Sequence, residues 1–141
     1  MKRKASAEWN GDLKSGKGAI STDSGVLSAT PYSFTTRFEN GKGTNPEELI
    51  AAAHAGCYTM ALSGELGKAG LVAESLRTSA TVTLEKLEVG WSVTESHLEV
   101  VAKIPGASAE AFQTAARAAE TGCPISRLLK AKITLDARLE A

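Results

Sequence analysis

The sequence predicts an α+β protein in which mostly antiparallel strands surround one long helix. Three observations carry this prediction: alternating apolar and polar residues at both ends of the chain, one long capped helical stretch between them, and a second amphipathic helix before the last strand. The length of 141 residues is ordinary for one domain. We therefore expect a single domain over residues 1–141, with a core of its own.

Short strands joined by tight turns are expected before the long helix. Asn10-Gly11 is a strong hairpin turn signal. The segment Tyr32–Phe38 has three aromatic residues and Thr36 on one face and Ser33, Thr35 and Arg37 on the other, so we expect a strand with Arg37 on its polar face. The remaining strands expected in this part of the chain are Lys4–Trp9, Gly16–Thr22 and Val26–Ala29.

The long helix is expected from Pro46 to about Lys68. Asn45 is a good N-cap, Pro46 is favourable at the first helical position, and Glu48 completes a capping-box pattern. Gly67 marks the end. A single small domain cannot easily surround such a helix, and its small residues allow close approach of another backbone. We therefore expect a dimer in which the two long helices pack together. The small residues are Ala51, Ala52, Ala53, Ala55, Gly56, Ala61 and Gly64.

The C-terminal half is expected to contain a hairpin, two helices and a last strand. The alternation of apolar residues shifts between Val93 and Leu98, which predicts a β-bulge near Glu95-Ser96. Ser108 is expected to cap the first of the two helices. The expected segments are strands at Thr78–Glu88, Trp91–Ile104 and Ile133–Leu139, and helices at Ala109–Thr121 and Ile125–Lys130.

Composition excludes several classes of function. Lys and Arg together number 16, as do Asp and Glu, so the net charge is zero and nucleic acid is not expected as a partner. No apolar run is long enough to span a membrane, and no apolar segment follows the basic N-terminus as it would in a signal peptide. We expect a cytoplasmic protein, in which the two cysteines are not expected to form a structural disulfide.

The two cysteines are the strongest candidates for chemistry. Cys57 lies in the middle of the long helix among Ala and Gly, where a buried packing role is the simpler interpretation. Cys123, in Gly122-Cys123-Pro124, is expected at a helix N-cap, where peptide N–H groups favour a thiolate. No Cys-x-x-Cys pair or Cys/His zinc spacing is present. If the thiols meet in space, a sulfenic acid on one would condense with the other, and spacing does not decide which is attacked first.

A cation is needed to ionise a peroxide-reactive thiol, and Arg37 is the best candidate. Glu47 and Glu48 are the carboxylates that would hold its guanidinium, with Glu47 the freer of the two. Ten residues separate Glu47 from Cys57, about 15 Å along a helix. We therefore favour a site built jointly by two chains, although the long reach of Arg37 within one chain is the alternative.

The histidines give weaker signals. His54 precedes Cys57 by three residues and can face it, which would suit a Cys–His acyl-transfer enzyme, but no third orienting group is evident. A packed or interface histidine is the simpler interpretation. His97 is expected on a strand and exposed.

At the level of motifs the sequence resembles the OsmC/Ohr family, and the OsmC branch in particular. The resemblance covers essentially the whole chain and includes both cysteine motifs in the right order. The matching segments are Thr36-Arg37-Phe38-Glu39, Gly43-Thr44-Asn45-Pro46-Glu47-Glu48-Leu49, Ala52-Ala53-His54-Ala55-Gly56-Cys57 and Gly122-Cys123-Pro124-Ile125-Ser126.

The resemblance implies an intertwined homodimer with active sites at its interface, and a thiol peroxidase that reduces organic hydroperoxides, and inorganic ones less well, in oxidative or osmotic stress. It assigns Cys57 as the peroxidatic thiol, Cys123 as the resolving thiol, Arg37 as the activating cation and Glu47 as its orienting carboxylate. It implies no metal, haem, flavin or other cofactor, only an external dithiol or lipoylated-protein reductant. Two alternatives use the same residues: a thiol-based peroxide sensor or binding protein with little turnover, and a purely structural dimer.

Overall fold

The computed structural model describes all 141 residues, Met1–Ala141. The chain divides into two compact units, Met1–Leu49 and Ile50–Ala141, and helix α2 begins in the first and continues through the second. The prediction of an α+β fold with mostly antiparallel strands is confirmed by two three-stranded sheets and four helices. Whether the chain behaves as one domain stays a prediction.

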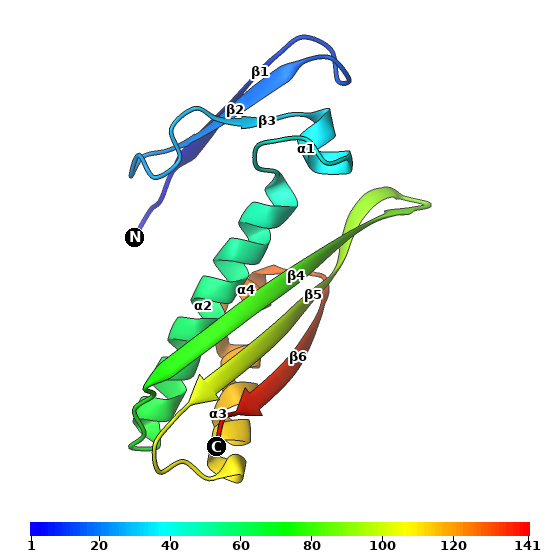
Figure 1. Ribbon diagram of the computed structural model, residues 1–141. Coiled ribbons are helices and arrows are strands. Elements are labelled where there is room, and N and C mark those ends of the chain that lie inside the picture. Colours follow the sequence, from blue (N-terminus) through cyan, green and yellow to red (C-terminus); the bar gives the residue numbers. More distant parts are fainter. The chain divides into compact units, whose positions relative to one another are not determined.

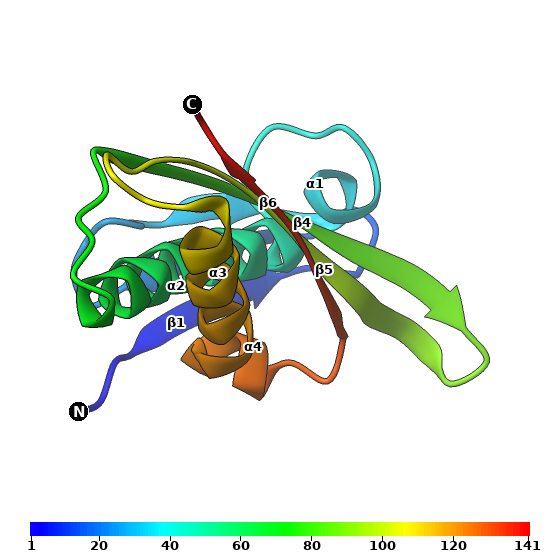
Figure 2. The ribbon, with the colours of Figure 1, turned by 90° about the horizontal axis from the view of Figure 1, so that it is seen from below.

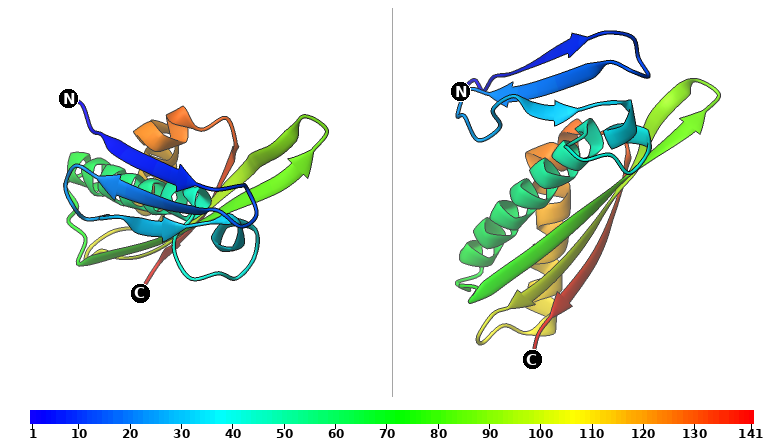
Figure 3. Two further views of the ribbon diagram at one scale, coloured as in Figure 1. Left: turned by 90° about the horizontal axis from the view of Figure 1, so that it is seen from above. Right: turned by 45° about the horizontal axis from the view of Figure 1, so that its top comes forward.

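The first unit is an antiparallel sheet followed by a short helix, and its three strands lie side by side in Figure 3. A hairpin follows Asn10 as predicted, but Asn10 itself pairs with Lys17 and the connection runs over residues 11–16 rather than a tight Asn-Gly turn. Gly11 has the positive φ of 96° that glycine tolerates best. The elements are β1 (Ala5–Asn10), β2 (Lys17–Thr22), β3 (Thr30–Tyr32) and α1 (Phe34–Phe38).

Two strand predictions in this unit are wrong. The segment predicted as strand Val26–Ala29 leads into β3 without pairing as a strand, and the last five residues of Tyr32–Phe38 form helix α1. Ser33 caps α1: its hydroxyl accepts from the Thr36 N–H at 3.3 Å, and the Thr36 hydroxyl accepts from the Ser33 N–H at 2.8 Å. This capping box outweighs the alternating pattern. Arg37 therefore lies on a helix rather than on the polar face of a strand.

The second unit is a sheet with helices packed on one face, as Figure 1 shows for α2 and α3 behind β4, β5 and β6. The short α4, orange in Figure 2, joins α3 to β6. Helix α2 has the bounds that the caps predicted. The elements are α2 (Pro46–Lys68), β4 (Ser75–Leu87), β5 (Gly90–Lys103), α3 (Ala109–Gly122), α4 (Pro124–Leu128) and β6 (Lys132–Leu139).

The strands β4 and β5 pair antiparallel, and β5 and β6 pair parallel. Thr83 pairs with Glu95 and Leu84 with Val93, which leaves Thr94 as an extra residue on β5. The predicted bulge is confirmed one residue before its expected place. Because of this shift, residues Ser96, Leu98, Val100 and Ala102 all face the helices and are buried, while the alternate positions face away from the core.

The core of the second unit joins α2, α3 and β5. Phe112 and Tyr58 are its largest members, and the Tyr58 hydroxyl donates to the Ala116 carbonyl at 3.2 Å, tying α2 to α3. Cys123 belongs to this core and is fully buried. The buried apolar residues are Tyr58, Leu62, Leu66, Leu98, Val100, Ala102, Ile104, Phe112, Ala115, Ala116, Ala119 and Cys123.

Candidate functional site

The two thiols lie together in the second unit. Cys57, on α2, is partly exposed and its thiol is close enough to hydrogen-bond that of Cys123, the N-cap residue of α4. Both are free cysteines. Convergence of the thiols, which the sequence left open, is thus confirmed; the assignment of the peroxidatic and resolving roles stays a prediction.

The electrostatics of the thiol pair oppose ionisation. Burial raises the pKa of the Cys57 thiol above its ordinary value, and the neighbouring Cys123 raises it further, while the backbone N–H of Ile125 donates to the sulfur and lowers it. The amide at the start of α4 therefore acts on Cys57, rather than on Cys123 as the sequence predicted. The direction of the net shift implies that thiolate formation at neutral pH needs an additional cation.

Arg37 and Glu47 form an ion pair in the first unit. The guanidinium Nη2 lies 2.7 Å from Glu47 Oε1, and Nε donates to both carboxylate oxygens at 3.1 and 3.3 Å. Glu47 is nearly buried, with 11% of its side chain exposed, whereas 39% of the Arg37 side chain is exposed. The predicted pairing of Arg37 with Glu47 is confirmed, and this forked geometry leaves the rest of the guanidinium accessible.

The start of α2 explains why Glu47 is free to pair. Asn45 caps the helix, since its side-chain oxygen accepts from the Glu48 N–H at 2.8 Å. The Glu48 carboxylate accepts from the Thr44 hydroxyl at 2.8 Å, a partner other than the one that a capping box predicts. Glu48 is thus engaged in the cap, and Glu47 points to α1.

An aromatic pocket of about 240 Å³ borders Arg37 in the first unit. The ring centroids of Trp9 and Tyr32 lie 5.5 Å apart, and the guanidinium carbon of Arg37 lies 5.5 Å from the centroid of the Phe38 ring. The sequence showed the aromatic residues but placed them on a strand, so this pocket was missed. Its lining consists of Trp9, Leu13, Tyr32, Ser33, Phe34, Arg37 and Phe38.

His54 connects the two cysteine segments. It is fully buried, and its Nδ1 lies 2.6 Å from the Ser96 hydroxyl while its Nε2 lies 2.7 Å from the Ser126 hydroxyl. His54 precedes Cys57 by three residues and Ser126 follows Cys123 by three, so this contact links the segments that carry the thiols. Both ring nitrogens are engaged by serines, an arrangement that favours the packed histidine over a Cys–His catalytic pair.

We expect His54→Ala to lower the free energy of unfolding by about 2–4 kcal/mol, because the buried Ser96 hydroxyl and the partly buried Ser126 hydroxyl lose their partner and a cavity remains. Ser126→Ala is the matched control, because it removes one hydrogen bond while leaving the ring in place; we expect a loss of about 1 kcal/mol. Urea unfolding of the full chain measures both. Equal losses in the two variants would contradict this role for His54.

Burial lowers the pKa of His54 below its ordinary value of 6.5. As the pH falls through about 6.5, His54 binds a proton in the unfolded chain but not in the folded chain. The free energy of unfolding that is present above this pH is therefore lost below it. We expect the free energy of unfolding to fall between about pH 7.5 and 5.5, and to fall less steeply in His54→Ala. Identical pH slopes in the two proteins would show that His54 does not contribute.

Two neighbouring thiols, one on the long helix α2 and one at the start of the short helix α4, define a protein with a pair of converging cysteines. Comparison with known proteins identifies the family. The model of the OsmC family, described as OsmC-like protein, matches residues 39–138. The chain belongs to this family. No helix has both the length and the apolar character that crossing a membrane requires.

The peroxiredoxin OsmC of Escherichia coli (strain K12) is 50% identical over 139 residues, which cover 99% of this chain and 97% of that protein. The crystal structure of the organic hydroperoxide resistance protein OhrB of Bacillus subtilis superposes with a TM-score of 0.68 at 24% identity, covering 97% of this chain and 98% of that one. An OsmC-like protein of unknown function from Vibrio cholerae gives a TM-score of 0.77 at 19% identity, over 97% of this chain and 99% of that one. The two structures show that the fold is shared.

Proposed function

We propose that the protein is a cysteine-based peroxidase that reduces hydroperoxides in stress defence. The observation that carries the proposal is the contact between Cys57 and Cys123 in a chain that belongs to the OsmC family. Similarity to a named peroxiredoxin at 50% identity supports the same activity. Organic hydroperoxides are the preferred class, because the pocket beside Arg37 is lined mainly by aromatic side chains that suit an alkyl or aryl group.

The reaction uses the two sulfurs in turn. The Cys57 thiolate attacks the distal oxygen of the hydroperoxide, the O–O bond breaks, and the leaving alkoxide takes up a proton and departs as alcohol. Cys57 is then a sulfenic acid. The Cys123 thiol attacks this sulfur, water leaves, and a Cys57–Cys123 disulfide forms. An external dithiol reduces the disulfide by exchange and is itself oxidised.

Arg37 supplies the cation that the thiol pair lacks. Its guanidinium, held by Glu47, would lower the pKa of Cys57 against the effect of burial and polarise the peroxide. Arg37 and the thiols belong to different compact units of the chain. A complete site therefore requires the two units to meet, and we propose that a unit from each of two chains does so in a homodimer.

The exposed face of α2 supports dimerisation. Small and apolar residues recur there at helical spacing, and added Cβ atoms at Gly56, Gly64 and Gly67 would meet nothing within 4 Å in the single chain. Met60 is 80% exposed on the same helix. A second copy of α2 would bury this surface with close backbone approach. The exposed positions are Ala52, Ala53, Gly56, Met60, Ser63, Gly64 and Gly67.

Mixing inactive chains tests the shared site. We expect Arg37→Ala and Cys57→Ser chains to be inactive separately and to regain up to about a quarter of wild-type activity after unfolding and refolding together, because half of the dimers are mixed and each holds one intact site. Samples of each variant that are unfolded and refolded alone are the controls. Absence of recovery, with heterodimers detected by mass spectrometry, would place Arg37 and Cys57 of one site in the same chain.

Steady-state turnover separates the enzyme from a sensor. With excess dithiothreitol, we expect many cycles of cumene hydroperoxide reduction and a higher kcat/KM for cumene hydroperoxide than for hydrogen peroxide. A single stoichiometric oxidation would instead favour a thiol-based peroxide sensor.

We further propose that a dithiol or lipoylated protein serves as the physiological reductant, that no prosthetic group is required, and that the protein acts in the cytoplasm.

A further inference from the structure

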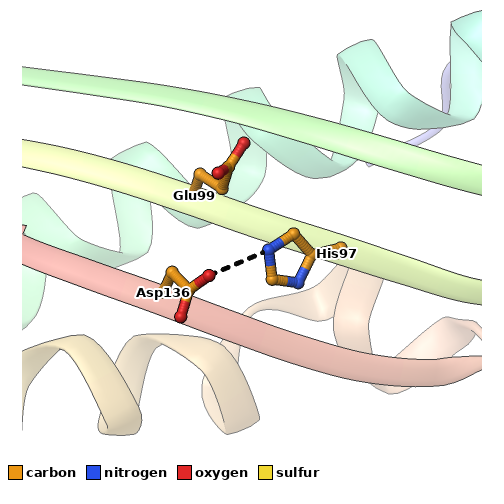
Figure 4. A group of neighbouring side chains, drawn as sticks. All are labelled: His97, Glu99 and Asp136. Atoms are coloured by element: carbon orange, nitrogen blue, oxygen red, sulfur yellow. Dashed lines mark ion pairs between the residues drawn. The ribbon is translucent and has the colours of Figure 1, made fainter.

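A cluster of metal-ligating side chains lies on the face of the β4–β5–β6 sheet that points away from the core. His97 and Glu99 are two residues apart on β5, and Glu99 pairs in register with Asp136 on β6. The three ligand atoms all lie within 4.8 Å of one another, and Figure 4 shows His97 and Asp136 facing each other with Glu99 beside them on β5. The peroxidase chemistry does not use any of them.

The Thr134 hydroxyl lies between His97 and a further carboxylate, 3.3 Å from Glu95 Oε1 and 2.5 Å from His97 Nδ1. When the hydroxyl donates to Glu95 it accepts from His97 Nδ1, and Nε2 of that neutral tautomer carries a lone pair. In the other tautomer the hydroxyl donates to Nδ1, and Nε2 carries the hydrogen.

The Nε2 atom faces a carboxylate. His97 Nε2 lies 3.2 Å from Asp136 Oδ2. A hydrogen on Nε2 would join the two atoms directly, whereas a metal ion bound by both would join them when the hydrogen is on Nδ1. Tetrahedral Zn²⁺ with ligand distances of about 2.0–2.1 Å has ligand-to-ligand edges of about 3.3 Å, which matches the separation of His97 and Asp136. The Glu99 carboxylate, within 4.8 Å of both, would move closer on binding.

The surroundings match a metal centre. A histidine that binds a metal usually donates its other ring N–H to a partner that orients the ring, and the Thr134 hydroxyl lies where it can accept from His97 Nδ1 and donate to Glu95. Glu99 supplies a third ligand from the same face, and the exposure of Glu99 and Asp136 leaves room for a water as the fourth. One imidazole with two carboxylates favours Zn²⁺ over Mg²⁺ or Ca²⁺, which prefer oxygen ligands alone.

We propose that His97, Glu99 and Asp136 form a zinc-binding site on the outer face of the sheet, with Thr134 and Glu95 orienting the histidine. The site takes one divalent transition-metal ion per chain through His97 Nε2 and two carboxylate oxygens. It is separate from the thiol pair, whose second member Cys123 lies in the core on the opposite face of the sheet.

Calorimetric titration with ZnCl₂ tests the site in the full, tag-free Cys57→Ser/Cys123→Ser chain, in which thiolates cannot bind the metal. We expect one Zn²⁺ per chain, affinity at least tenfold lower in His97→Ala and in Asp136→Asn, and a loss of about 10–100-fold in Thr134→Val. Glu88→Gln, which changes a carboxylate in the β4–β5 turn, is the matched control and should bind as the parent does. Circular dichroism confirms that each variant is folded.

Nitrogen NMR of the imidazole gives an independent measurement. We expect Zn²⁺ to shift the Nε2 resonance of His97 while Nδ1 keeps its hydrogen. Lack of binding up to about 1 mM Zn²⁺ would show that a proton alone joins His97 to Asp136, and would overturn the proposal. Undiminished affinity in His97→Ala, or Mg²⁺ binding as tightly as Zn²⁺, would overturn it as well.

Discussion

Cys57→Ser is expected to lower the peroxidase rate by about 10³-fold or more, the largest effect of any substitution in the chain, because a serine hydroxyl cannot replace an ionised thiol as the nucleophile. The substitution is nearly isosteric, so folding should be retained. Consumption of cumene hydroperoxide with excess dithiothreitol measures the loss. The neighbouring thiols give this experiment its matched control, since Cys123→Ser alters the other member of the same pair.

Cys123→Ser should separate the two steps. The first step needs only Cys57, so we expect one rapid equivalent of peroxide to be consumed and a sulfenic acid to accumulate, which dimedone traps at Cys57. Wild type should instead form an intramolecular disulfide. Trapping at Cys123 in the Cys57→Ser variant would reverse the assigned roles, and full activity in both variants would refute the mechanism.

Arg37→Met is expected to lower kcat/KM for the peroxide by about 10²–10³-fold at pH 7, because it removes the cation that offsets the burial of Cys57. Burial and Cys123 raise the pKa of Cys57, so without Arg37 the thiolate should form only at higher pH. The rate of the variant should therefore increase as the pH rises, over a range where the wild-type rate is already level. Thiolate absorbance near 240 nm follows the same titration directly.

Glu47 and Glu48 provide a neighbouring control pair. Glu47→Gln loses the charge that holds Arg37 at 2.7 Å, and we expect about a tenfold loss of kcat/KM. Glu48→Gln disturbs only the cap contact with Thr44 and should leave the rate close to wild type. If the two variants lose activity equally, the effect arises from the helix N-terminus rather than from orientation of the guanidinium.

Local rules in the sequence predicted α2 correctly from end to end. Asn45 and Pro46 act through hydrogen bonds and backbone angles within one turn, so their effect does not depend on the rest of the fold. The bulge at Thr94 was predicted for a similar reason, since one extra residue shifts the pattern of buried side chains that follows it. The prediction for α1 was wrong because two local signals competed, and the Ser33 cap prevailed over alternation.

The zinc-binding residues show what spacing within a sequence does not reveal. Metal motifs are recognised when the ligands lie close together in one segment, whereas here His97 and Asp136 come from two strands. Only the parallel register of β5 with β6 places them 3.2 Å apart. The same holds for His54, whose partners Ser96 and Ser126 lie far away in the chain.

The sequence by itself determined the fold class, the long capped helix and the two thiols as candidates, and its family resemblance chose Glu47 over Glu48 as the partner of Arg37. Tertiary structure decided that Cys57 and Cys123 meet, that burial works against the thiolate, and that His54 joins the two cysteine segments. The physical reason is the range of the forces involved. Capping and alternation act over a few residues, whereas thiol contact, desolvation and strand register exist only after distant segments pack together.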